Sequence, residues 1–297
     1  MDLFVQLLLN GLVAGSLYAL VAVGFALIFG ATRHFHIAHA GVFSSAGYLA
    51  VLATRELGLP GVLSALVGLT LAVLLGVALV RFLYVPLGRR GGAGFVLFLV
   101  SLGALVIVDN LFTINLGARP ARLAIGGWFH QTVSLGAWSM TVGQLLIVGL
   151  TLALFTSLVL VLSRTRAGKL IKAYSGNPEF VEVVGRRPRR VLVLVYAAGS
   201  LFAALAGLYV AADTGMQPGL GETYFIISIM AVFIGGIGSV VGAFIAAMTL
   251  GILQNILLIR IDAEWTLSVI FVLFLVLITA SPGGLTSVQL KPRRRTA

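Results

Sequence analysis

The chain has 297 residues, of which 60% are hydrophobic and only 10% are charged, and its formal net charge is +11. Soluble domains carry about 25% charged residues, so this composition excludes a water-soluble fold. The Lys and Arg residues lie in short loops and a tail between apolar runs, so no soluble basic face is available to bind nucleic acid. Because the chain has no cysteine, disulfides and thiolate metal sites are excluded as well.

Hydrophobic residues gather in about nine segments, at 3–30, 37–55, 60–86, 93–116, 140–163, 191–212, 223–235, 240–259 and 264–281. A helix needs about 20 apolar residues to cross the bilayer, and most of the segments reach this length. Segment 223–235 is too short and segment 37–55 contains several polar residues, so we expect both to be broken or partly buried helices. The pattern predicts an all-α polytopic membrane protein in which residues 1–297 form one transmembrane domain. We expect the first segment to be retained, because Met1-Asp2 lacks the positive charge of a cleavable signal.

Residues 163–190 form the one long polar stretch of the chain. Two acidic residues accompany eight basic ones there: Arg164, Arg166, Lys169, Lys172, Arg186, Arg187, Arg189 and Arg190. Short loops rich in Lys and Arg stay on the cytoplasmic side of a membrane. With nine segments the N-terminus then lies outside the cell, the C-terminus lies inside, and all but four of the 20 Lys and Arg residues are cytoplasmic. Eight segments would place the basic tail 286–297 outside, so we favour nine.

Apolar residues within 163–190 predict two short amphipathic helices, with Gly176-Asn177-Pro178 as the turn between them. A folded loop of this kind, in the middle of a membrane protein, is expected to be presented to a partner. The basic tail 286–297 is expected to be disordered and held to anionic lipid.

The first four and the last four segments run in opposite directions around the fifth, as an inverted repeat requires. Gly15-Ser16-Leu17-Tyr18 and Gly199-Ser200-Leu201-Phe202 are weakly alike. The two defective segments, 37–55 and 223–235, then occupy the same position in each half. Paired short helices interrupted by glycine indicate a transport path, so we expect the path to run beside these two segments.

Three histidines, His34, His36 and His39, cluster at the start of segment 37–55. The set lacks a carboxylate or a cysteine, and its spacing does not place all three on one helical face. Interfacial polar residues are therefore favoured over a metal site, and we expect no metal or cofactor. His39 lies deeper in the segment and is expected to make a structural hydrogen bond or to line the path.

Asp109-Asn110 lies within segment 93–116. An intramembrane carboxylate costs about 2.5–3.5 kcal/mol to insert, so Asp109 should face protein or water. A role in transport and a buried structural hydrogen bond both stay open, and a proton relay is disfavoured because no second acid or histidine is nearby in the chain. The candidate residues of the substrate path are His39, Ser44, Ser45, Asp109, Asn110 and Ser228.

A glycine-rich run over 235–242 resembles a nucleotide-binding loop only superficially, because its spacing is wrong and no Lys-Ser/Thr follows. Tight turns and close helix packing are the favoured use of such residues. The packing or hinge glycines are predicted to be Gly11, Gly15, Gly235, Gly236, Gly238 and Gly242. No Walker motif, nucleophile elbow or HExxH motif occurs, so the chain is not expected to be an enzyme.

Three blocks of the sequence carry a family resemblance. The first runs from Asn10-Gly11 through Gly15-Ser16 and Ile37-Ala38-His39 to Gly47-Tyr48. The central block is Thr165-Arg166-Ala167-Gly168-Lys169, Lys172-Ala173, Asn177-Pro178-Glu179 and Val184-Gly185. The third is Ala204-Leu205-Ala206-Gly207 and Gly235-Gly236-Ile237-Gly238-Ser239, with Pro282-Gly283-Gly284-Leu285 near the end. Over nearly the whole chain, these blocks resemble the permeases of branched-chain amino acid (Liv-type) ABC importers.

The resemblance implies the all-α fold of the vitamin B12 importers, with opposed repeats, in a bacterial-type inner membrane. It also implies a second permease subunit, two cytoplasmic ATPases that dock on residues 163–190, and a periplasmic binding protein. The ATPase-coupling residues that it implies are Arg166, Gly168, Lys169, Lys172, Ala173, Asn177, Pro178, Glu179 and Gly185. In this interpretation Gly168 lets the ATPase surface approach closely, and Asn177-Pro178 fixes the turn.

The chain departs from the family pattern at His36, Gly41 and Ser281, where the family often has Asn, Glu and Arg. The first two lie near the expected path, so specificity for leucine-type substrates stays open against urea, short amides and other amino acids. We expect the permease subunit of an ATP-driven importer for a small, branched-chain or hydrophobic amino acid. The alternative is a carrier or channel driven by an ion gradient, which predicts paired intramembrane charges. Whether two identical or two different permeases pair also stays open.

Overall fold

A computed structural model of the chain describes residues 2–91, 94–117, 119–136 and 138–280. The long helices are α1 (Asp2–Thr32), α2 (Ala38–Leu57), α3 (Gly61–Ala78), α5 (Gly94–Leu116), α6 (Val142–Arg164), α9 (Pro188–Asp213), α10 (Leu220–Gly235), α11 (Val240–Leu257) and α12 (Ala263–Ala280). A π-helical segment, η1 (Leu79–Tyr84), joins α3 to the short α4 (Val85–Arg89). Between α5 and α6 lie a 3-10 turn, η2 (Gly127–His130), and the strands β1 (Thr132–Leu135) and β2 (Trp138–Thr141). Two short helices, α7 (Arg166–Gly176) and α8 (Pro178–Val183), connect α6 to α9.

The predicted all-α polytopic fold is confirmed, and each of the nine hydrophobic segments lies on a helix. In the described part of the chain, seven helices are long and apolar enough to cross a membrane, namely α1, the continuous rod from α3 to α4, α5, α6, α9, α11 and α12. The count of nine crossing segments is therefore not confirmed for α2 and α10. The expectation that these two are partly buried is confirmed, but neither is broken. Their small and hydroxyl side chains let neighbouring helices approach without a break in either backbone.

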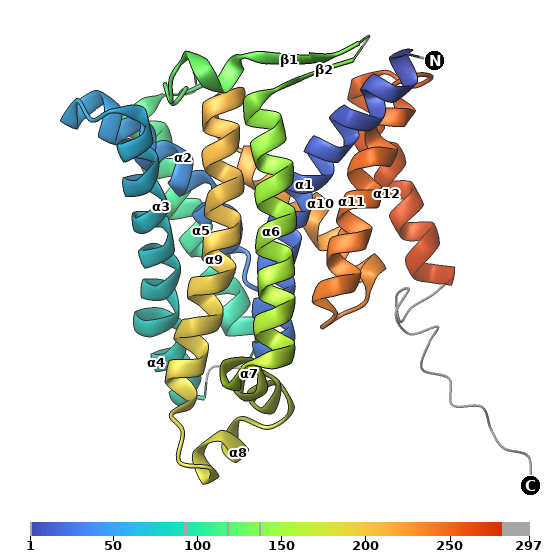
Figure 1. The fold of residues 1–297 in the computed structure, drawn as a ribbon. Coiled ribbons are helices and arrows are strands. Elements are labelled where there is room, and N and C mark those ends of the chain that lie inside the picture. The colour runs from blue at the N-terminus through green and yellow to red at the C-terminus, as the bar shows by residue number, and fades with distance from the viewer. Residues whose placement is uncertain (1, 92–93, 118, 137, 281–297) are drawn as a thin grey trace, which may run out of the picture.

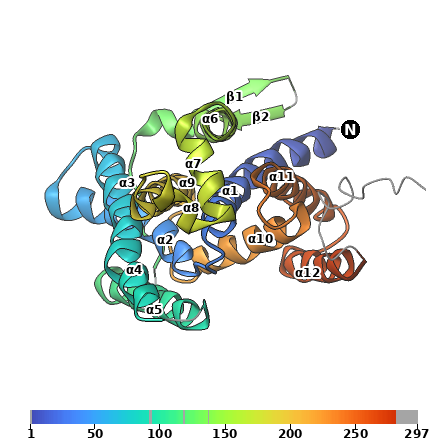
Figure 2. The ribbon, with the colours of Figure 1, turned by 90° about the horizontal axis from the view of Figure 1, so that it is seen from below.

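Figure 1 shows the β1–β2 hairpin at one end of the bundle and α7 and α8 at the opposite end. We call residues 163–190 the elbow, and we call the two ends of the molecule the hairpin end and the elbow end. Helix α1 runs from the hairpin end to the elbow end, and α9 runs the other way. Seen from the elbow end in Figure 2, α1 passes through the middle of the bundle, between the groups α2–α9 and α10–α12.

The helices of the two halves pack in corresponding ways, as the predicted inverted repeat requires. Helix α1 packs on α10 and α11, and its counterpart α9 packs on α2 and α3. Gly15 of α1 contacts the backbone of Gly251 in α11, and Gly76 of α3 contacts the side chain of Ser200 in α9. The weak sequence likeness around Gly15-Ser16 and Gly199-Ser200 therefore falls where each half makes its close helix crossing. Helices in lipid associate through close packing of this kind, because burial of apolar surface gains nothing there.

The hairpin was not predicted from the sequence. Its register pairs Thr132 with Thr141 and Leu135 with Trp138. Gln6 of α1 holds the hairpin through two hydrogen bonds to the main chain of Ser139, at 3.0 and 3.1 Å. Thr141 then begins α6, because its hydroxyl accepts a hydrogen bond from the amide of Gln144 while the Gln144 side chain accepts one from the amide of Thr141.

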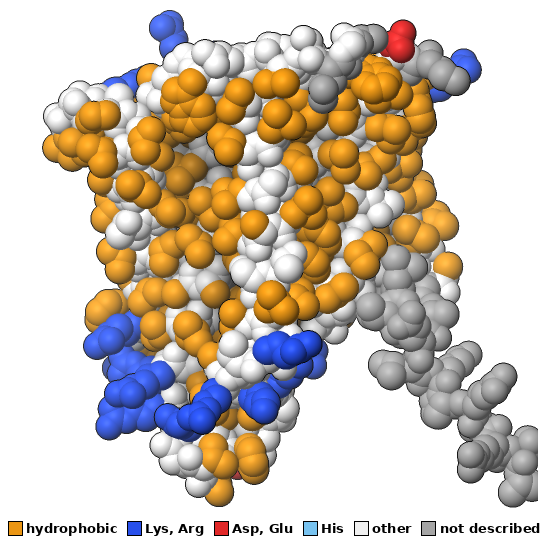
Figure 3. Space-filling view, in the orientation of Figure 1, with side chains coloured by type: hydrophobic (Ala, Val, Ile, Leu, Met, Phe, Trp, Pro, Cys, Tyr) orange, Lys and Arg blue, Asp and Glu red, His pale blue; other side chains and the backbone are white. Residues whose placement is uncertain are grey.

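Charge and apolar surface are separated along the bundle. Figure 3 shows hydrophobic side chains over the middle of the molecule and a concentration of Lys and Arg at the elbow end. This separation is the pattern of a protein that spans a bilayer. The basic tail 286–297, Ser281 and the block 282–285 lie outside the described residues.

Candidate functional site

The elbow consists of two short helices, each of which begins at its own capping residue. The Thr165 hydroxyl accepts a hydrogen bond of 3.2 Å from the amide of Gly168 at the start of α7. The side-chain oxygen of Asn177 accepts one of 2.8 Å from the amide of Glu179 at the start of α8, where Pro178 occupies the first helical position. The two predicted helices are thus present, with Asn177 as the residue between them.

The inner face of the elbow is fixed to the bundle. The Ser175 hydroxyl donates a hydrogen bond of 2.6 Å to the carbonyl oxygen of Gly30, near the end of α1. Ile171 of α7 and Val181 of α8 are buried, and α7 packs on α1, α6 and α9. The elbow is therefore in direct contact with the ends of three transmembrane helices.

Gly168 is buried and faces the bundle, not the solvent. A side chain at this position would collide with the backbone of Val161 and Leu162 in α6. The lack of a side chain at Gly168 therefore serves the contact between α6 and α7. Sequence reasoning had assigned it to the approach of a partner, and the structure shows a use within this chain.

The outer face of the elbow is exposed and carries both charge and apolar side chains. Arg166, Lys169, Lys172, Asn177, Pro178, Glu179 and Gly185 are exposed, and Ala173 is half-buried. Three of the apolar side chains that predict the amphipathic helices are also exposed, with fractions of 53% for Phe180, 82% for Val183 and 48% for Val184. These three form an apolar tip among charged residues, at the end of the molecule that carries most of the basic side chains (Figure 3).

Within the bundle, buried polar side chains lie close together where α2 packs on α5 and α10. Ser44 and Tyr48 of α2 are each about 1% exposed, and both lie beside Asp109 of α5. The Tyr48 hydroxyl has no hydrogen-bond partner among the described residues. Gly221 of α10 lies against the Ser44 side chain, and the ring of Phe112 stacks on Tyr48 with centroids 4.9 Å apart. Tyr48 was missed from the sequence, because an aromatic residue in an apolar run carries no distinguishing signal.

Four other predicted path residues bond backbone carbonyls, two of them in another helix. Ser45 donates to the carbonyl of Gly41 at 2.6 Å, and Ser228 donates to those of Tyr224 at 2.7 Å and Tyr18 of α1 at 3.2 Å. Asn110 is exposed on α5 and donates to the carbonyl of Val106 at 2.8 Å. His39 is fully buried, with one ring nitrogen 3.3 Å from the carbonyl oxygen of Val21. Ser45 and Asn110 bond only carbonyl groups of their own helices, and these bonds do not test a role in the path. Their place in the path stays a prediction.

Two of the predicted clustered histidines lie in a buried group with Tyr84 and Tyr196, which were not predicted to join them. His36 lies 2.9 Å from the hydroxyl of Tyr84 in η1, and the ring centroids of His36 and Tyr196 are 5.0 Å apart. His39 is next to His36, at 5.8 Å between centroids. In the part of the chain that the structure describes, no group of three or more His, Cys, Asp or Glu residues is placed to hold a metal ion.

Two of the predicted glycine pairs lie at close helix contacts. Gly11 and Gly15 face α11, and the backbones of Gly235 and Gly242 meet where α10 turns into α11. Gly236 and Gly238 form that turn, both with positive φ angles, at 102° and 88°. The missed partner of Gly11 and Gly15 is Gly251, which no local sequence signal connects to them.

The chain matches one protein family over most of its length. The family profile described as "Branched-chain amino acid transport system / permease component" covers residues 7–278. The high-affinity branched-chain amino acid transport system permease protein LivH of Escherichia coli is 25% identical over 294 residues, which are 95% of each chain. BraD of Pseudomonas aeruginosa, with the same description, is 26% identical over 263 residues, 84% of this chain and 85% of BraD.

Relatives with another substrate in their name are found as well. The fructose import permease protein FrcC of Rhizobium meliloti is 30% identical over 274 residues, which are 84% of this chain and 72% of FrcC. No solved structure gives a significant match. The profile match spans far more than half of the chain, so the protein belongs to the family of permease components of branched-chain amino acid transport systems.

Proposed function

We propose that this chain is the membrane-embedded permease of an ATP-driven importer for a small amino acid, with branched-chain or hydrophobic amino acids as the leading substrates. Two ATPase subunits would dock on the elbow, a second permease would pair with this one, and a binding protein would deliver the substrate at the hairpin end. The family membership supports the transport role, and the relatives named for branched-chain amino acids support the substrate class.

The observation that carries this proposal is the construction of the elbow. Its inner face is fixed to α1 and α6, while its outer face presents Phe180, Val183 and Val184 among charged residues. Exposed apolar side chains beyond the lipid-facing surface mark a protein contact. Charged groups around them set the orientation of such a contact. A partner that binds this tip would move the ends of the transmembrane helices when it changes shape.

The charge distribution supports a cytoplasmic elbow. Basic side chains concentrate at the elbow end, and the N-terminal end of α1 lies at the hairpin end (Figures 1 and 3). Under the rule that Lys-rich and Arg-rich loops remain in the cytoplasm, the hairpin end faces outward and the ATPases find the elbow on their own side.

Two exposed amide side chains on α5 support pairing with a second permease. Asn110 and Asn115 are exposed on this helix beside apolar residues such as Leu111 and Ile114. Polar side chains that would face lipid are costly, so this surface requires protein or water beside it. A second permease along α5 would cover Asn110 and Asn115.

The junction of α2, α5 and α10 supports a substrate path at that interface. The buried Tyr48 hydroxyl has no partner among the described residues, and it costs free energy unless a ligand or water satisfies it. Asp109 lies beside both Tyr48 and Ser44. An amino acid brings a positively charged ammonium group, which suits the carboxylate of Asp109. The path would follow α5 from the hairpin end to the elbow end.

The experiment is to co-express the chain with the ATPase, second-permease and binding-protein genes of its own transporter, and to measure ATP hydrolysis and amino acid uptake in proteoliposomes. We expect Val183→Glu to abolish co-purification of the ATPases and uptake, because it places a carboxylate on the apolar tip. Val133→Glu, on the exposed hairpin, is the matched control and should retain ATPase binding. Uptake by the chain alone, driven by an ion gradient, would contradict the proposal.

A further inference from the structure

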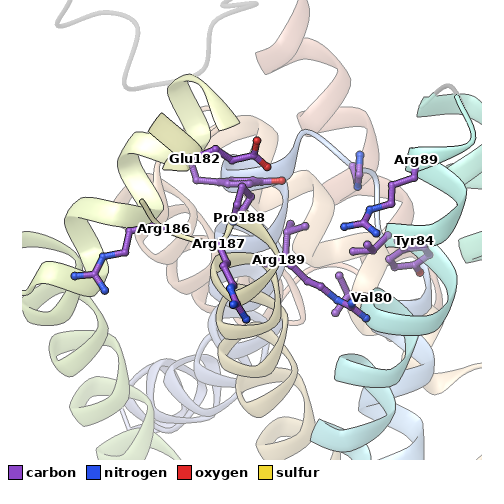
Figure 4. A pocket seen from close by; sticks show the side chains of 13 residues that line it. Val80, Tyr84, Arg89, Glu182, Arg186, Arg187, Pro188 and Arg189 are labelled. Atoms are coloured by element: carbon purple, nitrogen blue, oxygen red, sulfur yellow. The ribbon is translucent and has the colours of Figure 1, made fainter. Parts of the chain in front are cut away.

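A cavity of about 680 Å³ opens at the elbow end of the molecule, apart from the apolar tip of the elbow. It lies between η1 and α4 on one side and the start of α9 on the other. The connection from α8 to α9 and residue His34 complete its wall. Figure 4 shows this space and the side chains that line it.

The cavity is strongly basic. Four arginines contribute to its lining, against Glu182 as its one acidic residue: Arg89, Arg186, Arg187 and Arg189. In Figure 4, Arg89 of α4 and Arg189 of α9 both extend into the space between the two helices, while Arg186 points away from it. Two guanidinium groups from different helices thus line one cavity.

We propose that this cavity binds the phosphate of an anionic phospholipid head group in the leaflet at the elbow end. The planar guanidinium group matches phosphate oxygens with two parallel hydrogen bonds, so Arg89 and Arg189 suit one phosphate held between them. Tyr84 forms part of the floor, and its hydroxyl is already engaged by His36 at 2.9 Å. The arginines are therefore the charged groups that can hold the phosphate, and Tyr174 and His34 line the same cavity.

The apolar part of the wall selects a lipid over a soluble phosphate. Val80, Val85 and Leu192 line the same cavity, and they belong to helices that continue into the membrane-spanning apolar surface. Figure 3 shows a basic end and a hydrophobic belt on the molecule. Because its lining contains both arginine and apolar side chains, the cavity lies where these two regions meet. Basic pockets between transmembrane helices at this level are sites for anionic head groups. A free phosphate would leave the apolar wall unused.

A lipid in this position would connect α4 to the first turn of α9, and so to the elbow. The composition of that leaflet would then influence how firmly the elbow is held. The binding itself does not depend on the proposed transport function, because it needs neither an ATPase nor a substrate.

The test uses the purified full-length chain in detergent, with retained and added lipids counted by native mass spectrometry. The probes are phosphatidylglycerol, phosphatidylcholine and inorganic phosphate. The variant is Arg89→Gln/Arg189→Gln, and the control is Arg164→Gln/Arg166→Gln, which removes the same charge from positions that line neither this cavity nor the one beside it. Size-exclusion elution and tryptophan fluorescence verify the fold of each variant.

We expect the wild-type chain to retain phosphatidylglycerol in preference to phosphatidylcholine. Loss of two arginines at about 1 kcal/mol each should weaken phosphatidylglycerol binding about thirtyfold in the cavity variant. The control should lose less than about threefold, because its charges act only from a distance. Equal retention of both lipids by the wild type, equal losses in variant and control, or displacement of the lipid by inorganic phosphate would each overturn the proposal. The lipid comparison in the wild type holds even if the variant fails to fold.

Discussion

Ser175 of α7 donates a hydrogen bond of 2.6 Å from its hydroxyl to the carbonyl oxygen of Gly30 in α1. These residues are 145 positions apart in the chain, and they join the elbow to the helix that passes through the middle of the bundle. Gly30 also lies against Gly238, in the turn between α10 and α11. Two contacts that share Gly30 therefore link the elbow to both halves of the repeat.

Replacing Ser175 with Ala should loosen the elbow from α1. The lost hydrogen bond is worth about 1 kcal/mol, so the thermal unfolding midpoint should fall slightly. Substrate-stimulated ATP hydrolysis by the assembled transporter should fall more than its basal hydrolysis. Ser163→Ala is the control, because the Ser163 hydroxyl bonds only carbonyl groups of its own helix. If substrate stimulated ATP hydrolysis equally in the Ser175→Ala and Ser163→Ala variants, the Ser175 hydrogen bond would have no part in linking the ATPases to the bundle.

Replacing Gly15 with Leu should separate α1 from α11. The backbone of α11 leaves no room for a leucine side chain there. Overpacking of a core costs about 1–3 kcal/mol, and the free energy of unfolding should fall by that amount or more. Thermal unfolding in detergent measures this loss. Gly149→Leu, at an open position on α6, should leave the unfolding midpoint nearly unchanged. A similar midpoint for both variants would show that the α1–α11 crossing is not a close contact.

Replacing Asn177 with Ala should fray the start of α8. The lost cap costs about 1 kcal/mol, whereas Asn177→Asp keeps an acceptor oxygen at the same place. We expect faster amide hydrogen exchange over 178–183 in the Ala variant and an exchange rate close to wild type in the Asp variant. If amide exchange in the Ala variant were as slow as in the wild type, the burial of Val181 would be sufficient to stabilise α8 without the Asn177 cap.

Replacing Asp109 with Asn tests the proposed path. A hydrogen bond to a charged group is worth about 1.5–3 kcal/mol, so the efficiency of amino acid uptake should fall roughly ten- to hundredfold. ATPase binding should be unchanged, because Asp109 lies within α5 and away from the elbow. Asp109→Glu should retain part of the uptake. Normal uptake by the Asn variant would leave Asp109 with a structural role only.

Local signals made much of the elbow predictable. Thr165 and Asn177-Pro178 are recognisable caps that act within a few residues, so both short helices could be placed from the sequence. The apolar segments were predictable for a similar reason, since the bilayer imposes one length on every crossing helix. The burial of α2 was predictable because polar and small side chains are unfavourable against lipid and suit close contact with other helices.

Long-range contacts could not be predicted in the same way. Gly251 meets Gly15, and Arg89 and Arg189 line one cavity, only because the chain folds back over many residues. Ser44, Tyr48 and Asp109 come together from two helices whose rotations the sequence pattern does not define. The inward direction of Gly168 likewise depends on where α7 lies against α6. The hairpin β1–β2 is held by Gln6, which is remote in sequence.

The side of the membrane on which the elbow lies tests the central claim most directly. The chain has no cysteine, so single substitutions can be labelled without background. In intact bacterial cells, a membrane-impermeant maleimide should label Ser134→Cys on the hairpin and leave Glu179→Cys on the elbow unlabelled. Inside-out vesicles should reverse this pattern. Labelling of Glu179→Cys in intact cells would place the elbow beyond the reach of any cytoplasmic ATPase and contradict the account.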